Sequence, residues 1–304
     1  VPGAKEMLIK VRATTVNAAD QNMRGFVHVP PGLGFLARLM MGLKKPRISI
    51  QGTVLAGQVE ETGGEVISFK KGDRVFATAE HAGAYGQYTC LTEKGAFTTM
   101  PENLSFEEAA TVPYGALTAF YFLHDKAKVA QGQKVLVRGA SGGVGIWAVQ
   151  LARHFGARVT GVCSTANVDY VKSMGAHDVI DYTKEDVCQS ERKWDIILDV
   201  VVGKTSFQRY KKILEPKGYY LAVAGGLNDM LNMIWTSITG GRKVVFGGGA
   251  ACEKKENLQL IKELIEAGKL QPTLDKIFPF VEMVEAHRYV ESGAKKGSIA
   301  VRVA

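Results

Sequence analysis

The residues with the clearest chemical meaning form a glycine-rich turn near the middle of the chain. Val135 and Val137 precede it, and its glycines recur every third residue, at Gly139, Gly142 and Gly145. Apolar residues at helical spacing follow, which indicates a strand, a turn and a helix. Glycine permits the sharp turn, lets the backbone approach a pyrophosphate and lets the helix pack closely on the strand. The free N–H groups at the helix start can then bind phosphate. We therefore predict dinucleotide contacts from Ser141, Gly142, Gly143, Val144 and Gly145.

The next predicted strand ends at Ser164 and Thr165, where the adenosine ribose would bind. An acidic residue there would accept a hydrogen bond from the 2′-hydroxyl of NAD, and this strand end carries none. Hydroxyl groups can instead hydrogen-bond a 2′-phosphate, and Tyr182 after the following strand could add a phenol. We therefore expect NADPH as the cofactor, with NADH as the alternative. Ser164 and Thr165 could also cap the helix that begins near Asn167, and the two roles are compatible.

Metal ligands and paired thiols are scarce. The four cysteines, Cys90, Cys163, Cys188 and Cys252, are scattered and form no CxxC motif. This usage argues against a disulfide framework and a cysteine-rich zinc site, and it fits a reducing compartment. The six histidines form no close pair and no HExxH motif, so we expect them to be structural or surface residues. We expect no bound metal.

The first hundred residues predict a β-structure that would position part of the site. They contain short segments rich in Val, Ile, Tyr and Thr between Gly and Asp turns, which is typical of a compact barrel or sandwich. Between the first two strands lies Gly25–Lys45, which Gly and Pro interrupt; we expect a loop or lid, with a membrane-surface helix as the alternative. The predicted strands are Met7–Val16, Gln51–Glu60, Val66–Ser68, Arg74–Ala77 and Gln87–Leu91.

From about Ser105 the pattern changes to alternating helices and strands. A cap-like Ser105 opens a helical stretch that extends through Leu123. The later alternation predicts βαβ units around a parallel sheet, so the expected fold class is α/β. The predicted strands are Lys134–Arg138, Arg158–Cys163, Asp178–Asp181, Asp195–Val200, Gly218–Ala224 and Lys243–Gly247. The predicted helices are Val144–Phe155, Asn167–Met174, Thr205–Leu214 and Glu256–Ala267. The tail, Gln271 to Ala304, returns to short strands around a helix at Val281–Glu291 and is expected to rejoin the first domain.

Composition and charge limit the possible classes of protein. The chain has 304 residues, 46% hydrophobic and 22% charged, which excludes a disordered or collagen-like protein and suggests about two domains. A net charge of +8 favours anionic partners such as phosphate cofactors, nucleic acid or an acidic membrane surface. No apolar run reaches the roughly 18 residues that a membrane helix needs, and no secretory signal is visible. We expect a cytoplasmic protein, with an organelle as the alternative.

Taken together, the motifs resemble the medium-chain dehydrogenase/reductase superfamily, and within it the zinc-free quinone oxidoreductase branch. The resemblance covers essentially the whole chain. It implies a GroES-like β-barrel domain for the substrate and a Rossmann doubly wound parallel-sheet domain, with boundaries at residues 1–108, 109–250 and 251–304. It also implies that the natural protein begins upstream of Val1. The motifs that carry it are Val16-Asn17-Ala18-Ala19-Asp20, Lys71-Gly72-Asp73-Arg74-Val75, Leu117-Thr118-Ala119, the turn at Gly139–Gly145, the segment from Gly175 to Tyr182, and Lys296-Gly297.

The resemblance also bears on the reaction. Zinc-containing members carry Cys, His-Glu and Cys around a catalytic metal, and the matching positions here are Asn17, Thr53-Val54 and about Tyr114. None of these is the thiolate or imidazole that zinc prefers. Alcohol oxidation would therefore lack its Lewis acid. Quinones and α,β-unsaturated carbonyls instead accept hydride at carbon while charge builds on a distant oxygen, which hydrogen-bond donors can stabilise. The resemblance thus implies an NADPH-dependent oxidoreductase that reduces a quinone or enone without zinc.

Family positions assign roles to individual residues. Asn17 would contact the nicotinamide or the substrate carbonyl, Tyr114 would polarise that carbonyl or supply a proton, and Asp20 would lie near the cleft. Alternatively, Asn17 fixes a turn, Tyr114 is an aromatic residue at the edge of the core, and Asp20 is a turn or cap residue. Further cofactor contacts are expected from Thr118, from glycines at the carboxyl ends of two strands, and from the returning tail. These residues are Thr118, Gly225, Gly247, Lys296 and Gly297.

Two departures from the family pattern affect these expectations. Many relatives carry a basic residue where Ala166 stands, which weakens the case for NADPH. Many also carry an acid in the segment matched by Gly52-Thr53-Val54, so the substrate cleft is expected to differ in shape.

Other functions and a dimeric assembly are also compatible with the sequence. One alternative is a zinc-independent alcohol dehydrogenase. Another is a nucleotide-bound, non-enzymatic protein of structural or RNA-associated function, which the charge of +8 would suit. The chain has no RNA-binding module or arginine-rich run, so we expect no specific nucleic-acid partner. Relatives are often homodimers joined through the edges of their Rossmann sheets, and Lys243–Phe246 is the candidate edge here.

Overall fold

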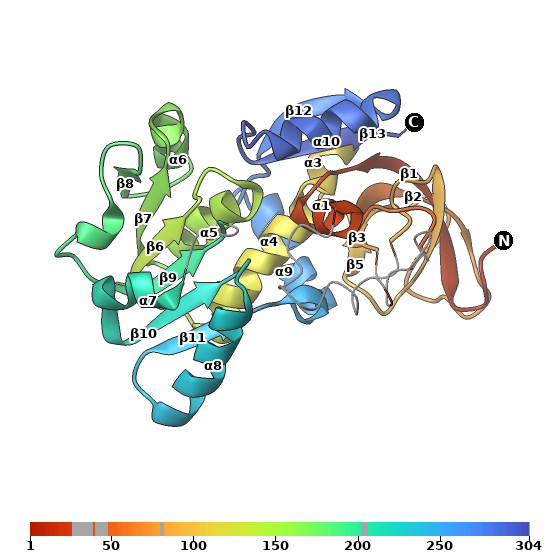
Figure 1. Cartoon of the computed structure of the whole chain (residues 1–304). Helices are drawn as coiled ribbons and strands as arrows, with labels where there is room; N and C mark the ends of the chain where they lie inside the picture. Colours follow the sequence, from red (N-terminus) through yellow and green to blue (C-terminus); the bar gives the residue numbers. More distant parts are fainter. Residues whose placement is uncertain (26–38, 40–47, 80–81, 202–205, 304) are drawn as a thin grey trace. The chain divides into compact units, whose positions relative to one another are not determined.

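The chain folds as two compact units. The computed structural model describes residues 1–25, 39, 48–79, 82–201 and 206–303. One unit comprises Val1–Leu117 with Glu253–Ala304, and the other comprises Thr118–Cys252, so the chain leaves the first unit once and returns to it (Figure 1). The predicted α/β class is confirmed. The lid expected at Gly25–Lys45 lies, apart from Gly25 and Leu39, outside the described residues.

The first unit is built on a seven-stranded sheet. Its order is β12-β13-β1-β2-β3-β5, and β4 also pairs with β1. Alternation along β1 buries Met7, Ile9 and Val11, which pack with Leu55 and Phe97 in the core of this unit. The strands are β1 (Glu6–Thr14), β2 (Val54–Thr62), β3 (Arg74–Thr78), β4 (Tyr88–Thr92), β5 (Phe97–Thr99), β12 (Leu274–Pro279) and β13 (Ser298–Arg302).

One strand prediction in this unit is wrong. Val66–Ser68 lies outside the sheet, and a short strand that was not predicted, β5, pairs with β3 instead. Val66 and Phe69 still pack against the core from their loop. Burial of apolar side chains therefore does not require backbone pairing, and the apolar pattern alone could not separate the two cases.

Five helices accompany this sheet among the described residues. They are α1 (Ala18–Gly25), α3 (Phe106–Ala110), α4 (Val112–Phe120), α9 (Lys255–Glu266) and α10 (Met283–Glu291). Ser105 caps α3 with a reciprocal hydrogen bond to Glu108, as its sequence predicts. The boundary expected after residue 108 falls within α3, which contacts β1, β2 and β13 and buries Ala109 and Ala110. The first unit accordingly continues to Leu117.

The second unit is a six-stranded parallel sheet in the order β11-β10-β9-β6-β7-β8. Its strands lie close to their predicted positions because each contains buried apolar residues, as Val135, Leu136 and Val137 are in β6, which is typical of a parallel strand. They are β6 (Lys134–Arg138), β7 (Arg158–Cys163), β8 (Asp178–Asp181), β9 (Trp194–Asp199), β10 (Leu214–Ala222) and β11 (Lys243–Phe246). The edges of the sheet are β11 and β8.

The helices of this unit agree less well with the sequence prediction. Helices α5 (Gly143–His154) and α6 (Val168–Ser173) match. The predicted helix at Thr205–Leu214 shortens to α7 (Phe207–Tyr210) and a 3₁₀ turn, because Leu214 is buried as the first residue of β10. Helix α8 (Leu227–Thr239) was not predicted, since it has no charged face to mark its period. No described helix is both long and apolar enough to cross a bilayer.

Candidate cofactor and active site

The glycine-rich turn joins β6 to α5, as its sequence predicts. Gly139 has a φ of +76°, and Gly142 is the N-cap of α5. A Cβ on Gly145 would lie 2.1 Å from the Gly139 carbonyl oxygen, so only glycine allows the helix this close to the turn. At Gly142 the nearest atom to an added Cβ would be 3.4 Å away, which leaves that face of the turn open. Open backbone at a helix N-terminus is what a pyrophosphate group requires.

Asn167 connects the two hydroxyls expected to face the cofactor. Its Nδ2 donates to Ser141 Oγ at 3.2 Å and to Ser164 Oγ at 3.3 Å. Both serine oxygens act as acceptors in these bonds, so each serine keeps its own hydroxyl hydrogen as a donor. The sequence prediction named Ser141 and Ser164 but not Asn167. An asparagine at the start of a helix is ordinarily a cap residue, so nothing in the sequence indicated that Asn167 would hydrogen-bond both serines.

Asp181 is a carboxylate that the sequence prediction did not place near Thr165. It ends β8 beside the end of β7, where Cys163 pairs with it. The Thr165 hydroxyl donates to Asp181 Oδ2 at 2.5 Å, and Thr183 also hydrogen-bonds this carboxylate. The Thr165 hydrogen bond in particular lowers the pKa of Asp181 to about 2. The Lys184 ammonium lies 3.5 Å from Asp181 Oδ2. Thr165 therefore directs its hydroxyl hydrogen at Asp181. Tyr182, which was also expected to contact the cofactor, has a side chain that is 63% exposed.

A second polar cluster surrounds Asn17, which follows β1 and begins α1. Asn17 is only 8% exposed. Its Oδ1 accepts from the backbone N–H of Ala19 at 2.8 Å and of Asp20 at 3.2 Å. Its Nδ2 donates to Thr53 Oγ1 at 2.8 Å. Asn17 therefore does fix the start of α1, as the alternative interpretation held, and its amide nitrogen is also joined to the residue before β2.

Asp20 is the buried anchor of this cluster. It is fully buried and accepts from Asn17 N at 2.9 Å, Thr53 N at 3.1 Å and Thr53 Oγ1 at 3.0 Å. Burial raises the pKa of Asp20 to about 6, against the opposing effect of these hydrogen bonds. The structure thus brings Asn17 and Asp20, which the sequence analysis proposed as site residues, together with Thr53, which it did not propose as one.

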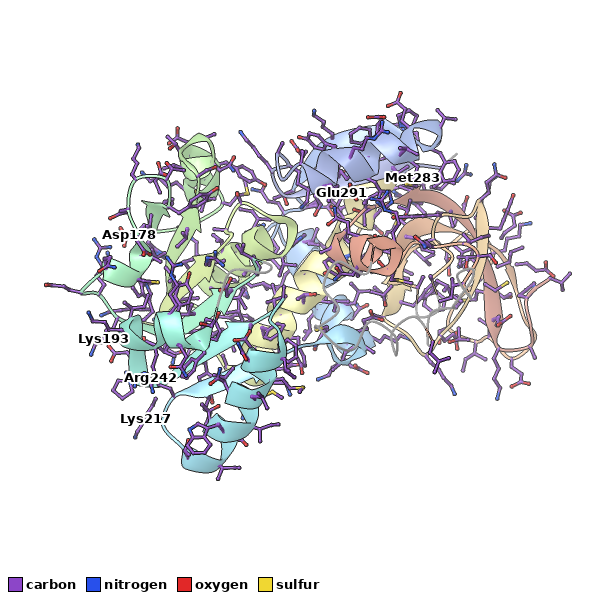
Figure 2. The ribbon with its side chains drawn as sticks, in the orientation of Figure 1. Asp178, Lys193, Lys217, Arg242, Met283 and Glu291 are labelled. Atoms are coloured by element: carbon purple, nitrogen blue, oxygen red, sulfur yellow. The ribbon has the colours of Figure 1, made fainter. Side chains whose placement is uncertain are left out.

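Tyr85 and His287 continue the cluster outward from Asp20. Burial, together with the charge of the nearby Asp20 carboxylate, raises the pKa of Tyr85, whose hydroxyl donates to the Thr15 carbonyl oxygen at 3.5 Å. His287 Nε2 lies 3.4 Å from Tyr85 Oη, and burial lowers the pKa of His287. Arg24 of α1 forms an ion pair with Glu291. Glu291 is the last residue of α10 and is labelled in Figure 2. Neither Tyr85 nor His287 was a predicted site residue, because nothing near them in sequence relates them to Asp20.

The other predicted site residues lie on several elements. Tyr114 is half-buried on α4, and Thr118 is buried near the end of that helix. Gly225 follows β10, and an added Cβ there would meet Asp229 Oδ2 at 2.7 Å. Gly247 follows β11 with a φ of +71° and open space at its Cβ position.

In the C-terminal segment at Lys295–Gly297, hydrogen bonds to backbone groups fix the turn. Lys296 is exposed, and its N–H donates to Asp275 Oδ2 at 3.1 Å. Gly297 has a φ of +70°, and an added Cβ would lie 2.6 Å from Thr273 Oγ1. The neighbouring Lys295 donates from Nζ to the Gly297 carbonyl at 2.8 Å, and burial lowers its pKa to about 8. Gly297 is therefore required by the turn itself.

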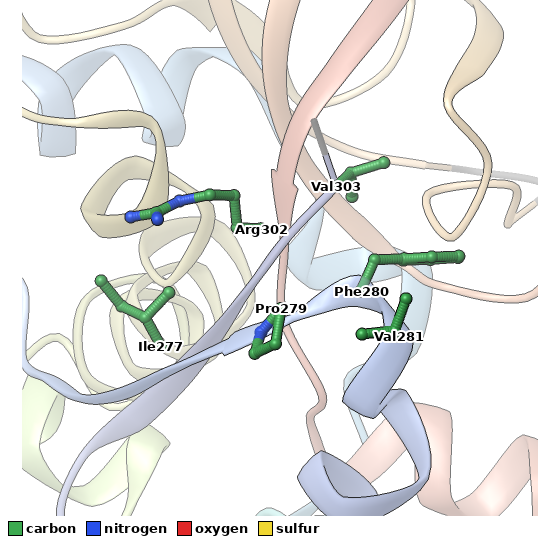
Figure 3. Close-up of a pocket in the computed structure, with 6 residues that line it drawn as sticks. All are labelled: Ile277, Pro279, Phe280, Val281, Arg302 and Val303. Carbon is green, nitrogen blue, oxygen red and sulfur yellow. The ribbon is translucent and has the colours of Figure 1, made fainter.

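Two further observations concern ligands. A hollow of about 420 Å³ in the first unit is lined by apolar side chains and Arg302, whose guanidinium pairs with Glu107 (Figure 3). It shares no residue with the Asn17 cluster. Within the described part of the chain, no three His, Cys, Asp or Glu side chains gather as metal ligands would.

Comparisons with known proteins identify the family. Family models described as an alcohol dehydrogenase GroES-like domain and a zinc-binding dehydrogenase match residues 3–131 and 174–301. The mitochondrial NAD(P)H oxidoreductase RTN4IP1 of Bos taurus is 31% identical over 98% of this chain and 82% of its own length. The 2-methylene-furan-3-one reductase of Solanum lycopersicum is 31% identical over 99% of this chain and 73% of its own.

A solved structure agrees with these relatives. The quinone oxidoreductase from Coxiella burnetii has a TM-score of 0.86 and 29% identity, covering 100% of this chain and 92% of its own. The expected GroES-like and Rossmann-like architecture is thereby confirmed. This chain belongs to the medium-chain dehydrogenase/reductase superfamily, in its quinone oxidoreductase branch.

Proposed function

We propose that this chain is an NADPH-dependent oxidoreductase that transfers a hydride to a quinone or an α,β-unsaturated carbonyl without zinc. The observation that carries the proposal is the cluster of Asn17, Thr53 and Asp20. At positions where zinc-containing relatives carry metal ligands, this chain has a carboxamide and a hydroxyl that hydrogen-bond each other. The relatives support the class, since they include an NAD(P)H oxidoreductase, a quinone oxidoreductase and a 2-methylene-furan-3-one reductase.

The second unit supplies the groups that would hold the cofactor. Backbone N–H groups of the turn at Gly142–Gly145 would bind the pyrophosphate, because the added-Cβ positions leave one face of that turn open. The hydroxyl hydrogens of Ser141 and Ser164 are available as phosphate donors. Thr118, Thr165, Tyr182, Gly225, Gly247, Lys296 and Gly297 remain proposed further contacts. When bound, the nicotinamide supplies the hydride.

The preference for NADPH rests on a balance of charges near Thr165. The sequence argument held that no carboxylate lies near the 2′ position, whereas Asp181 accepts a hydrogen bond from Thr165. The Lys184 ammonium beside Asp181 offsets this charge, and Ser164 keeps a hydroxyl donor. We therefore retain NADPH as the proposed cofactor, with Ser164 rather than Thr165 as its donor and NADH as the alternative.

The first unit supplies the groups proposed to act on the substrate. Asn17 keeps one amide hydrogen that it does not use on Thr53, and this hydrogen can stabilise negative charge that develops on a carbonyl oxygen. Tyr114 is proposed to polarise the same carbonyl or to supply its proton. Asp20 is fully buried, so we assign it a positioning role rather than direct contact with the substrate.

An acceptor screen on the purified protein tests this function. We expect NADPH consumption with 9,10-phenanthrenequinone or with members of an enone panel, at a rate independent of zinc content measured by mass spectrometry. Turnover that tracks bound zinc, or oxidation of alcohols in place of enone reduction, would point to an alcohol dehydrogenase. If no acceptor is reduced while RNA binds with a steep dependence on salt, the enzymatic proposal fails.

We also propose a homodimer formed through the β11 edge of the parallel sheet. Helix α8, which packs against β11, presents large apolar side chains to solvent at helical spacing. Such a stripe beside an unpaired strand edge is typical of a surface that associates. The exposed residues are Leu227, Leu231, Ile234, Trp235 and Ile238.

The proposed compartment is a reducing one, such as the cytoplasm or an organelle matrix. All four cysteines are free in the structure. The relative from Bos taurus is a mitochondrial protein, which supports the organelle alternative. Fractionation of cells that express the protein distinguishes the cytoplasm from an organelle.

A further inference from the structure

The hydrogen bonds around Thr53 determine which way the Asn17 amide faces. Thr53 Oγ1 lies 3.0 Å from Asp20 Oδ1, and a carboxylate oxygen can only accept, so the Thr53 hydroxyl donates its single hydrogen to Asp20. Thr53 Oγ1 can then only accept from its other neighbour, which is the Asn17 amide at 2.8 Å. The Asn17 atom facing Thr53 must therefore be nitrogen.

The opposite end of the amide is constrained in the same sense. Asn17 Oδ1 receives the backbone N–H groups of Ala19 and Asp20 at the start of α1. If the amide were flipped, its NH₂ group would face these two N–H donors and its oxygen would face a hydroxyl oxygen without a hydrogen between them. Both contacts would be repulsive, so the flip costs two sets of hydrogen bonds.

We propose that Thr53 is a positioning residue that makes Asn17 a hydrogen-bond donor only, so that Asn17 contacts the carbonyl oxygen of the substrate. Both lone pairs of Oδ1 are used within the chain, and one Nδ2 hydrogen is not used by any described residue. The free group is thus a donor, which matches an oxygen that gains negative charge during hydride transfer. This assignment rests on the proposed function, and it selects one of the two contacts expected for Asn17 from the sequence.

Tyr85 packs beside the hydrogen-bonded cluster of Asn17, Asp20 and Thr53. Its ring packs against Gly52, where an added Cβ would lie 2.5 Å from Tyr85 Cδ1, and its hydroxyl donates to the carbonyl oxygen of Thr15. Tyr85 therefore restrains the residue that precedes Thr53 and the segment that leads to Asn17. His287 in α10 lies against the same hydroxyl. The orientation of Asn17 thus depends on four segments that are distant in sequence.

Thr53→Val tests the proposal because it removes the hydroxyl and keeps the shape. We expect kcat for the best acceptor to fall about 10- to 100-fold, with the dissociation constant for NADPH unchanged. Thr53→Ser keeps the hydroxyl and should recover most of the lost kcat. Thr78→Val is the matched control, because the Thr78 hydroxyl is buried on the adjacent strand without a partner among the described residues. A Thr53→Val enzyme with wild-type kcat, or a loss confined to NADPH binding, would overturn the proposal.

A measurement of the Asn17 amide separates this inference from the proposed function. The chain has seven asparagines, so ¹⁵N-asparagine labelling gives few side-chain amide signals, and Asn17→Ala identifies the one from Asn17. We expect Thr53→Val, but not Thr53→Ser or Thr78→Val, to shift the two amide hydrogens of Asn17. If wild type reduces no acceptor, the proposed function fails while these spectra still test the orientation. Unchanged Asn17 signals in a folded Thr53→Val protein would contradict the positioning role even if the enzyme is active.

Discussion

At the scale of single residues, the site depends on buried polar groups that satisfy each other. Asn17, Asp20 and Thr53 exchange hydrogen bonds that account for each side chain's orientation. A buried polar group without a partner costs about 1–3 kcal/mol, so the cluster is stable only as a complete set. The same requirement holds at the cofactor turn, where Asn167 donates to both Ser141 and Ser164.

The raised pKa of Asp20 predicts a specific dependence of stability on pH. The pKa is about 6 in the folded chain and 3.8 in the unfolded one, so the folded state retains a proton that the unfolded state releases. The stability from this protonation is fully present below pH 4 and is lost as the pH rises through 6. Between pH 4 and 7, wild type should lose about 2 kcal/mol relative to Asp20→Asn. Urea unfolding of both proteins across this range measures it, and parallel pH curves would contradict it.

Ser164 predicts how the protein discriminates between cofactors. Because its hydroxyl hydrogen is free to donate to a 2′-phosphate, Ser164→Ala should weaken NADPH binding about 2- to 10-fold and leave NADH binding nearly unchanged. Thr165→Val is the comparison, since the Thr165 hydrogen is directed at Asp181 and its loss should change the NADPH to NADH ratio less. Fluorescence titration gives both affinities. Tighter binding of NADH than NADPH by wild type would reverse the proposed cofactor preference.

At the scale of elements, the junction of β6 and α5 shows how glycine allows close packing. The Gly145 Cα lies so near the Gly139 carbonyl that a methyl group would overlap it. At Gly226, which is the N-cap of α8, no atom lies within 4 Å of an added Cβ and φ is −123°. Close packing therefore requires glycine at position 145 but not at position 226, although both glycines lie at the start of a helix in the second unit.

Substitution at these two glycines tests that difference. Gly145→Ala should destabilise the protein by about 2–4 kcal/mol and weaken NADPH binding at least about 10-fold, because the turn must move away from α5. Gly226→Ala should change stability by less than about 1 kcal/mol. Thermal or urea unfolding and cofactor titration measure both effects. Equal effects of the two substitutions would show that the close approach at Gly145 is not what the turn requires.

At the scale of the whole molecule, the apolar stripe on α8 predicts self-association. The Trp235 side chain is 67% exposed and that of Ile238 is 78% exposed. We expect wild type to have twice the chain mass of 32.9 kDa in light scattering, and Trp235→Lys with Ile238→Lys to shift it to the monomer. Val281→Lys, at an exposed apolar residue of the first unit, is the control and should leave the mass unchanged. A monomeric wild-type protein would refute the proposed interface.

The parts of the fold that were predicted correctly are those with a short-range signal. The six parallel strands were recognisable because short apolar runs, such as Val135-Leu136-Val137 in β6 and Ile196-Ile197-Leu198 in β9, lie between polar residues and turns. Val66–Ser68 was mistaken because an apolar segment can be buried without pairing to a sheet. Helix α8 was missed because it has no charged face to mark its helical period. The segment at Thr205–Leu214 was mistaken because burial of Leu214 in the sheet outweighed helical spacing.

The sequence by itself determined the two classes of domain and the glycine turn, and its resemblance to a known family pointed to Asn17 and Asp20. The domain classes and the turn depend on local patterns that are visible in the chain. Only the tertiary structure decided that Thr53, Tyr85 and His287 join that pair, that Asp181 lies beside Thr165, and that the Asn17 amide offers a donor. The hydrogen bond between Tyr85 and His287 spans 202 residues of chain. The direction of each such hydrogen bond depends on which donor and acceptor groups become neighbours in the folded interior. Tertiary packing decides which groups become neighbours, and the separation of the residues along the sequence does not.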